Sequence, residues 1–518
     1  MLALLVVLST IANAQGQPTS AAPRLVVSIA VDQLRSDYLE AFVPLFGEKG
    51  FKRLMSEGAV YTNVAYPFTP VDRASASAAL STGTTPYYNG IVGQRWMNKE
   101  TLRPMSCTDD DRQKGLYTVS KSSPRLLLTS TIGDELKMAT SGKALVYALA
   151  PESDAAIFGA GHAADGAFWI DDNSGAWCSS DFYFKQMPSW MVGINGLSAP
   201  MVCVASAKWE PTNELVGNFS YFIGGGQQTP FKHTFTGANK YREFKTSGLV
   251  NASITDAAMA CVNSTGMGND GVTDLLSVTY FAGNYAHHPI GECQMELQDT
   301  YVRLDNELAR LIDTLQGQFG ADNVLFVLTS TGYTSEEGGD YERYNIPTGT
   351  FYMDRSANLL NMYFGAIYGQ GRFVEQCFGN QIYLNHKLLE QKRVSIADAT
   401  GRAQEFLSQL SGVSNVYTSL QLLTTDNRHT DKVRAGFHAE RSGDILIEVT
   451  PGWQLLNEET QEHLSPRAAY VQFPIIFLGA GIGAQRVTTP VSTERIAPTI
   501  ARAIRIRAPN GSTAEPLF

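Results

Sequence analysis

The sequence lacks several features that mark particular classes of protein. Its six cysteines include no CxxC spacing, which leaves little support for a zinc knuckle or a thioredoxin-like redox site. It contains no internal repeats, no low-complexity linker and no late apolar run that we expect to span a membrane. Basic residues number 40 against 50 acidic ones, and the net charge of −10 argues against a nucleic-acid partner.

The first fourteen residues lack lysine and arginine but otherwise follow the pattern of a secretory signal peptide. An apolar run ends in Ala12-Asn13-Ala14, which is a small-x-small cleavage site. The run is too short to span a bilayer, and no cysteine follows the cleavage site to carry a lipid anchor. We therefore expect a signal peptide at residues 1–14 and an exported protein.

In an exported protein, six cysteines permit up to three disulfides, and the sequence does not determine their pairing. The favoured interpretation is a mixture of structural disulfides and buried thiols. The residues concerned are Cys107, Cys178, Cys203, Cys261, Cys293 and Cys377.

Continuous apolar runs indicate strands that are buried on both faces of a sheet. Such runs occur at 25–31, 144–148, 275–280, 323–329 and 471–478. Helices are predicted over 38–51, 74–80 and 295–315. This alternation predicts an α/β protein with a doubly wound, mostly parallel sheet.

Residues 24–518 are predicted to form a single domain. The stretches near 89–120 and 349–448 look irregular, and we expect them to be insertions that cap the carboxyl edge of the sheet. Ligands of doubly wound sheets bind at this edge, where Asp32, Arg73 and Thr331 are expected.

The segment Thr69-Pro-Val-Asp-Arg-Ala-Ser-Ala-Ser-Ala-Ala-Leu-Ser-Thr-Gly83 resembles the nucleophile turn of the alkaline phosphatase superfamily. The resemblance is to its secreted bacterial branch, which is related to phosphate-irrepressible alkaline phosphatase and to nucleotide pyrophosphatases/phosphodiesterases. In that branch a threonine attacks phosphorus, and a gapless match places Arg73 at its position. A guanidinium stays protonated and has no free lone pair, so Arg73 cannot be the nucleophile.

The resemblance also implies two zinc ions, held by Asp and His side chains. Among the six family ligand positions, those that keep a suitable residue are Asp32, His288 and His463. Those that have lost it are Asn284, Thr331 and Gly332. An amide is a weak zinc ligand and glycine offers none, so we expect no cofactor, or at most one weakly bound zinc ion.

The family positions that contact phosphate have changed as well. Gln94 stands where the family has an asparagine, and Glu152 and Asp154 replace a lysine and an arginine. Two carboxylates in place of two cations would repel a phosphate dianion. His162 lies in a well-matched family segment, where it is a structural residue.

Arg73 is expected to pair with Asp32 in place of a metal ion, because an unpaired buried carboxylate is costly. An exposed Arg73 and an Arg73 that binds a ligand are the alternatives. His287 and the pair Glu336-Glu337 are candidate substitute ligands, although a solvent-facing loop explains the two glutamates better.

Three functions are compatible with this site. The favoured one is a catalytically inactive pseudophosphatase, a binding or scaffolding component with an unknown protein partner, for example in a cell-envelope complex. The second is a repurposed single-metal hydrolase that uses His288 and His463. The third is an active hydrolase of phosphate mono- or diesters whose nucleophile is Thr69, Ser75 or Ser77. In each case we expect a location in the periplasm or cell envelope of a bacterium, with no transmembrane segment.

Overall fold

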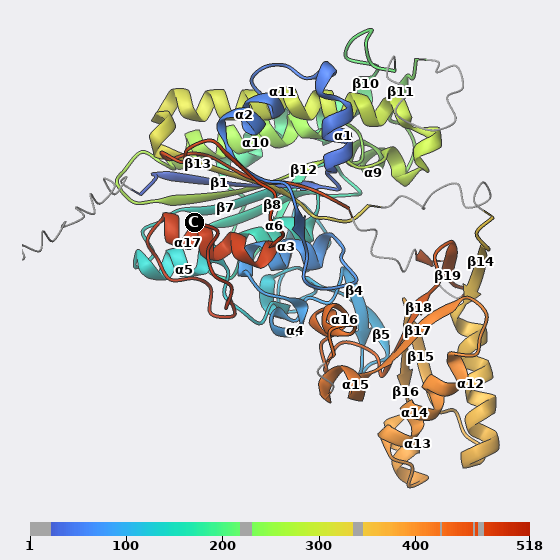
Figure 1. The fold of residues 1–518 in the computed structure, drawn as a ribbon. Coiled ribbons are helices and arrows are strands. Elements are labelled where there is room, and N and C mark those ends of the chain that lie inside the picture. The colour runs from blue at the N-terminus through green and yellow to red at the C-terminus, as the bar shows by residue number, and fades with distance from the viewer. Residues whose placement is uncertain (1–21, 218–229, 335–344, 425–426, 459–461, 465–470) are drawn as a thin grey trace, which may run out of the picture.

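The structure of the protein is a computed structural model that describes residues 22–217, 230–334, 345–424, 427–458, 462–464 and 471–518. The predicted signal peptide at 1–14 lies outside these residues. A ten-stranded sheet forms the centre of the larger part of the molecule (Figure 1). In spatial order its strands are β22 (Gln485–Val487), β2 (Ala59–Tyr61), β21 (Ile475–Gly479), β13 (Val324–Ser330), β1 (Leu25–Asp32), β12 (Asp274–Phe281), β7 (Val146–Ala150), β8 (Gly166–Ile170), β9 (Trp177–Ser180) and β6 (Gly115–Leu116).

The middle of the sheet is parallel. Strands β13, β1, β12, β7 and β8 run in one direction, while β21 and β9 run antiparallel to their inner neighbours. Every residue of β13 is buried, as expected for a strand that is covered on both faces. The prediction of an α/β protein with a mostly parallel sheet is confirmed, and each of the five predicted strands is present within a few residues of its expected bounds.

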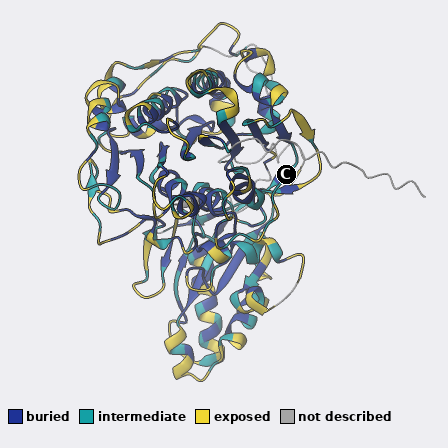
Figure 2. Cartoon of the chain, turned by 90° about the vertical axis from the view of Figure 1, so that its left-hand side faces the viewer, coloured by how far each residue is buried: buried dark blue, intermediate teal, exposed yellow. Residues whose placement is uncertain are grey.

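Helices cover both faces of the sheet (Figure 1). Those on one face are α1 (Ser36–Ala41), α2 (Phe51–Glu57), α10 (Val250–Thr265) and α11 (Gln294–Phe319). Those on the other face are α3 (Arg73–Thr82), α5 (Ile132–Ala139), α6 (Ser153–Ala160) and α17 (Ile496–Ala503). Buried residues therefore gather between the helices and the sheet, and exposed residues lie on the outer surfaces (Figure 2).

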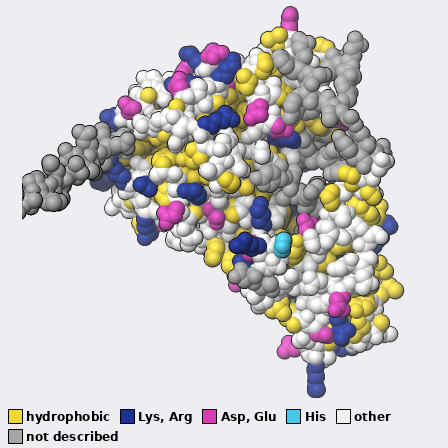
Figure 3. Space-filling model, in the orientation of Figure 1, with side chains coloured by type: hydrophobic (Ala, Val, Ile, Leu, Met, Phe, Trp, Pro, Cys, Tyr) yellow, Lys and Arg dark blue, Asp and Glu magenta, His cyan; other side chains and the backbone are white. Residues whose placement is uncertain are grey.

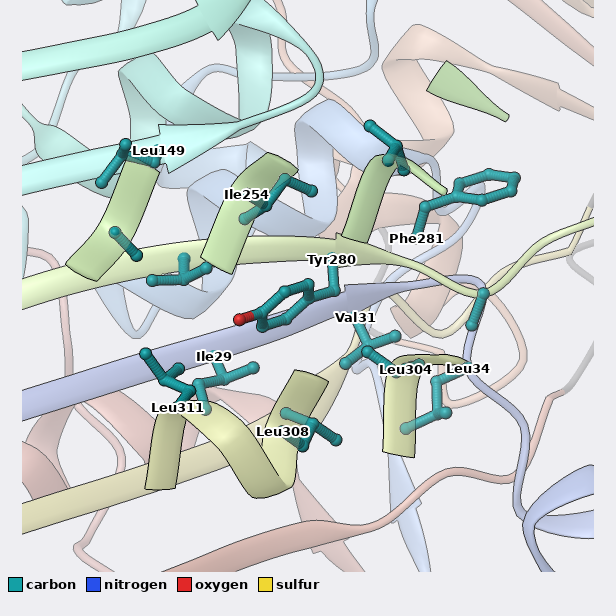
Figure 4. Close-up of a cluster of buried hydrophobic side chains, with 14 of the residues drawn as sticks. Ile29, Val31, Leu34, Leu149, Ile254, Tyr280, Phe281, Leu304, Leu308 and Leu311 are labelled. Atoms are coloured by element: carbon teal, nitrogen blue, oxygen red, sulfur yellow. The ribbon is translucent and has the colours of Figure 1, made fainter. Parts of the chain in front are cut away.

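The main core lies between the sheet and α11. Ile29 and Val31 of β1 face Leu308 and Leu304 of α11, and Tyr280 of β12 lies beside them (Figure 4). The apolar positions of α11 recur at helical spacing, which is why the sequence predicts this helix correctly over 295–315. Burial of these apolar side chains is the main interaction that stabilises the packing of α11 on the sheet.

Residues 349–464 build a second lobe that projects from the sheet (Figures 1 and 2). One of its sheets consists of β15 (Val374–Phe378), β16 (Gln381–Leu384), β18 (Ile445–Val449) and β17 (Val413–Thr418). A second consists of β14 (Gly349–Tyr352), β19 (Trp453–Asn457) and β20 (Glu462–Leu464). Its helices are α12 (Met353–Tyr368), α13 (His386–Gln391), α14 (Ile396–Leu407), α15 (Ser419–Thr424) and α16 (Asp431–Gly436).

The expectation that the stretches near 89–120 and 349–448 are irregular is wrong. The first contains a hairpin of β4 (Arg95–Asn98) and β5 (Arg103–Ser106), and the second has its own hydrophobic core. Sequence patterns missed these elements because their strands are short and their apolar residues do not form continuous runs. Whether both stretches act as caps stays a prediction.

The remaining elements are short and connect the larger ones. They are β3 (Val64–Ala65), α4 (Pro86–Asn89), η2 (Pro124–Leu126), α7 (Ser189–Leu197), α8 (Pro200–Cys203), η3 (Val204–Ser206), β10 (Lys208–Trp209), β11 (His233–Thr234), α9 (Lys240–Lys245), η4 (Tyr285–His287), η5 (Ile290–Glu292), η6 (Ala321–Asn323), β23 (Val491–Ser492) and η7 (Thr493–Arg495).

The expectation of structural disulfides is not met. All six cysteines lie within the described residues, and no disulfide joins any two of them. Five of them are buried and Cys203 is half-buried, so the buried-thiol part of the interpretation is confirmed.

The helix predicted over 38–51 is wrong as a single element. The chain forms α1, a turn of 3-10 helix at Val43–Leu45 (η1) that contains Pro44, and then α2. Asp305 of α11 holds the turn before α2, since its carboxylate accepts hydrogen bonds from the Gly47 and Phe51 backbone amides at 2.8 and 2.6 Å. A Cβ atom on Gly50 would lie 2.2 Å from the Asp305 carboxylate, so only glycine fits there.

We predict that Asp305→Ala lowers the free energy of unfolding by about 1–3 kcal/mol, because two backbone donors lose their acceptor. Chemical denaturation followed by circular dichroism measures the change. Asp313→Ala removes a carboxylate of the same helix that is partly exposed and pairs with Lys49 and Arg53, and it should change stability little. Equal losses for the two variants would contradict the structural role of Asp305.

Candidate functional site

The carboxyl ends of the parallel strands bring the sequence-predicted residues together. Asp32 ends β1, Glu152 and Asp154 follow β7, Asn284 follows β12 and Thr331 follows β13. The edge lies at the right-hand end of the sheet in Figure 1, which is where doubly wound sheets bind ligands.

Arg73 lies at the first turn of α3 and binds Asp154 through two hydrogen bonds. Its Nε is 2.8 Å from Oδ1 of Asp154, and its Nη2 is 3.1 Å from Oδ2. The predicted ion pair with Asp32 is also present, with Nη1 3.8 Å from Oδ2, and Glu152 lies 3.9 Å from Nη2. Burial opposes the charge of Arg73, but Asp154 and Glu152 hold the pKa of the guanidinium well above its usual range.

Asp32 is buried, and three groups neutralise or solvate it. Thr331 Oγ1 donates to it at 2.9 Å, Tyr333 donates its hydroxyl at 3.3 Å, and Arg73 supplies the cation. Burial raises the pKa of Asp32 to about 6, against the lowering effect of Arg73 and of the two hydroxyls. Asp32 therefore changes charge close to neutral pH.

Asp72 fixes the turn that presents Arg73. Its carboxylate accepts a hydrogen bond from the Ser75 backbone amide at 2.9 Å, and the Ser75 hydroxyl accepts one from the Asp72 backbone amide at 3.0 Å, which forms a capping box for α3. Its other oxygen accepts the backbone amide of Gln94 at 2.6 Å. The hydroxyl of Ser75 is thus held by the cap rather than presented to the site.

Lys245 is a second buried cation, which the sequence analysis missed. Its Nζ is 2.9 Å from the Glu152 carboxylate and also contacts Asp172. Burial works against its charge, but Glu152 and Asp172 outweigh this effect and raise the pKa of Lys245. The residue lies at the end of α9, in a segment with no recognisable motif, and only the fold brings it to Glu152.

His287 lies in a strained turn at the same edge. Its φ is +57° and that of Ala286 is +47°, a backbone region that residues other than glycine rarely adopt. Burial lowers the pKa of His287, and the nearby Arg73 lowers it further. Its imidazole is therefore neutral at neutral pH, with one ring nitrogen able to accept a proton.

These groups surround a cavity of about 510 Å³. Arg73, Gln94, Glu152, His287 and Tyr333 are among its lining residues, with Lys245, Arg242 and Asp172 beside them. The three hydroxyls that the sequence suggests as nucleophiles, those of Thr69, Ser75 and Ser77, are not among the lining residues. Ser77 instead lines a much smaller internal cavity of about 40 Å³ between α3 and the sheet.

The family metal positions do not fit a two-zinc site. At Gly332 a Cβ would come within 2.5 Å of the Tyr66 ring and 2.7 Å of the Phe473 ring, so no histidine can stand there. The Asn284 amide donates to the His288 carbonyl, and the exposed His288 ring lies 3.5 Å from Glu292. Within the described residues, no three His, Cys, Asp or Glu side chains are placed to share an ion.

The remaining sequence candidates lie elsewhere or outside the described residues. His463 belongs to β20, where its backbone pairs with Leu456, and its side chain is not described. Glu336 and Glu337 fall outside the described residues. His162 lies 3.0 Å from the Asp134 carboxylate and 3.1 Å from the Leu127 carbonyl, in agreement with a structural role.

We predict that Arg73→Met lowers the free energy of unfolding by about 3–5 kcal/mol, because Asp154 and Asp32 are left as buried carboxylates without their cation. Thermal and chemical denaturation measure the loss. The matched control is Arg402→Met, which removes two hydrogen bonds to Asp398 from a pair whose two side chains are both exposed, and it should have no measurable effect. A stable Arg73→Met variant would contradict the role of this ion pair.

The effect of Arg73→Met should depend on pH. Burial raises the pKa of Asp32 from its ordinary value of 3.8 to about 6, so between these two pH values the folded state binds more protons than the unfolded chain. The contribution of Asp32 to the stability of the folded state therefore falls as the pH rises through this interval. An ionised Asp32 depends on the charge of Arg73 more than a protonated Asp32 does. We expect a larger loss near neutral pH than at about pH 5, and the reverse order would contradict the assignment.

Whole-length relatives of this chain carry the names of phosphatases. The sequence is 29% identical over 522 residues to alkaline phosphatase PafA of Elizabethkingia meningoseptica, which covers 97% of this chain and 95% of that protein. It is 29% identical over 516 residues to alkaline phosphatase PhoV of Synechococcus elongatus, with 95% and 92% covered. The crystal structure of wild-type PafA superposes on 96% of this chain and 98% of that one, at 26% identity and a TM-score of 0.83.

These relatives contradict two expectations from the sequence. The favoured function there is an inactive pseudophosphatase, whereas the proteins that match along almost the whole chain are named alkaline phosphatases. The expectation of no cofactor, or at most one weakly bound zinc ion, is contradicted as well, because the resemblance ties alkaline phosphatase activity to bound zinc.

The family assignment itself is confirmed. The model of the family described as type I phosphodiesterase/nucleotide pyrophosphatase matches residues 26–470, which is most of the chain. The central sheet and the PafA superposition agree with this match. The chain therefore belongs to the type I phosphodiesterase/nucleotide pyrophosphatase family, within the alkaline phosphatase superfamily.

Proposed function

We propose that this protein is an active hydrolase of phosphate mono- or diesters in which water, and not a side chain at position 73, attacks phosphorus. The observation that carries the proposal is the cavity at the carboxyl edge, where buried cations and a neutral imidazole line one space. The whole-length similarity to proteins named alkaline phosphatases supports the same reaction class.

Arg73, Lys245 and Arg242 are the groups that would bind the phosphoryl oxygens. Arg73 uses Nε and Nη2 for Asp154, and its Nη1 has no contact with a carboxylate shorter than 3.8 Å among the described residues. A guanidinium has five donors, so Nη1 keeps hydrogens for a substrate oxygen. Charge-assisted bonds of this kind stabilise the negative charge that develops in the transition state.

His287 is the general base of the proposed reaction. Its lowered pKa keeps the ring unprotonated at neutral pH, and it lines the same cavity as Arg73. A ring nitrogen takes a proton from water while the water oxygen bonds to phosphorus. The ester P–O bond breaks, and the leaving oxygen departs with a proton from solvent or from the protonated ring.

The surrounding carboxylates favour a diester over a monoester. Glu152 and Asp172 line the cavity and Asp154 lies behind Arg73. A phosphate diester carries one negative charge and a monoester up to two, so these carboxylates repel a monoester more strongly. We therefore expect the protein to hydrolyse diesters faster than monoesters.

Metal ions belong to the activity that the resemblance implies, where they activate the nucleophile and neutralise phosphate. Because the family ligand positions do not fit two zinc ions, no step of this proposal passes through a metal. We also propose that the protein is exported to the periplasm or cell envelope, on the basis of the apolar N-terminal segment and its cleavage site.

We predict turnover of an aryl phosphate diester that exceeds turnover of the matching monoester. His287→Asn should lower kcat by about 10²–10⁴-fold through loss of the base. His429→Asn removes an exposed imidazole of the lobe and serves as the control. Activity of the wild type should rise with pH through the lowered pKa of His287 and level off below neutral pH. No turnover of either ester, or full activity of His287→Asn, would overturn the proposal.

We predict that a chelator lowers this turnover without abolishing it, because the steps assigned to His287 and Arg73 need no metal, and that zinc restores the lost part, as the resemblance implies. Elemental analysis of the purified protein, before and after the chelator, measures how many ions leave. Turnover that the chelator leaves unchanged would contradict a contribution of zinc, and complete loss would contradict attack by water without a metal.

A further inference from the structure

The segment from Gln186 to Ala207 contains no charged residue. It forms α7, α8 and η3, which pack against α9 and α10 on the outside of the molecule. Four of its aliphatic side chains are exposed to solvent, namely Val192 (42%), Leu197 (82%), Met201 (40%) and Val202 (47%). We call these four side chains the α7–α8 patch.

The patch is not an unfinished part of the core. The inward face of the same segment is already buried, with Met191 and Val204 at 0% and 1% exposure. The side chain of Asn195 is also fixed, because it forms two hydrogen bonds of 2.8 Å with the Trp177 backbone. The exposed side chains therefore remain available after the segment has packed.

The segment Ser189–Ser206 is long and apolar enough to cross a membrane by length and composition, which the sequence analysis did not expect. Its helices argue against a span. The helix α7 has nine residues and a length of about 14 Å, against about 30 Å of bilayer core. The chain leaves the helix at Ser198, and Pro200 begins the next one.

We propose that the α7–α8 patch is a peripheral docking site for a lipid bilayer that contains anionic headgroups. Short helices with apolar side chains on one face lie in the interface of a bilayer rather than across it. Lys185 and Lys208, both exposed, flank the uncharged segment on its two sides in the sequence. Their charges complement lipid phosphates, and their long side chains reach the headgroup layer.

The composition of the patch favours lipid over a protein partner. Leucine and valine are under-represented among the residues that anchor protein interfaces, whereas such side chains bury readily at a bilayer surface. The four exposed side chains of the patch are all aliphatic, and the one tryptophan of the segment, Trp190, packs on Phe168 with the ring centroids 5.2 Å apart. The proposal does not depend on the activity, because no residue of the patch lines the catalytic cavity.

The test is co-sedimentation of the mature protein with vesicles of phosphatidylcholine alone and of phosphatidylcholine with phosphatidylglycerol. We expect binding to the anionic vesicles and weaker binding to the neutral ones. The double variant Leu197→Asp/Met201→Asp should bind at least about tenfold more weakly, because two apolar side chains that would enter the bilayer become charged. Lys185→Gln and Lys208→Gln should each lower binding to the anionic vesicles by about fivefold.

The matched control is Leu359→Asp/Met362→Asp, which places the same two charges on exposed apolar side chains (44% and 71%) of α12 in the second lobe. Apolar side chains are visible on the lobe in Figure 3, so this control tests exposed apolar surface in general. Circular dichroism checks that each variant is folded. The proposal fails if the wild type does not bind the vesicles or if Leu359→Asp/Met362→Asp weakens binding as much as Leu197→Asp/Met201→Asp. It also fails if size-exclusion chromatography shows a dimer that only Leu197→Asp/Met201→Asp dissociates, since the patch would then bind a second copy.

Discussion

The site depends on one buried cluster of charges, in which Arg73 forms ion pairs with Asp154 and Asp32. Three strongly desolvated groups from α3, α6 and β1 meet there, and none of them is tolerable alone in a buried position. The pairing fixes how α3 and α6 lie over the ends of β1 and β7. It also limits how far burial raises the pKa of Asp32, and Arg73 contributes to the lowered pKa of His287. The geometry of the cavity therefore follows from this cluster.

The charges of the site are rearranged relative to the pattern that the resemblance implies. A cation stands at the nucleophile position, and two carboxylates stand where the family has cations. Lys245 approaches from α9 and restores a positive charge beside Glu152. The sequence analysis compared the family's site positions one by one and, because several had lost their residue, predicted an inactive protein. Such a comparison cannot find residues that reach the site from other parts of the fold. The relatives that match along the whole chain are named alkaline phosphatases, which contradicts the prediction.

Local patterns predicted the central sheet well, because strands covered on both faces need continuous apolar runs and α11 needs apolar residues at helical spacing. They failed where tertiary contacts decide. The break between α1 and α2 depends on Asp305, which lies far away in the sequence and binds the amides of the turn. The six described cysteines form no disulfide with one another although an exported chain permits disulfides, because a disulfide requires two cysteines to meet in the fold.

The sequence by itself determined the fold class, the family, and the fact that Arg73 cannot attack phosphorus. Those conclusions rest on residue chemistry and on spacing within short segments. The tertiary structure decided which side chains share the cavity: it adds Lys245, Asp172 and Tyr333, keeps Ser75 in a helix cap and turns Ser77 toward the sheet. It also decided that Asp154, more than Asp32, is the partner of Arg73. The reason is that contacts between distant segments depend on how helices pack across the sheet edge, which no local pattern encodes.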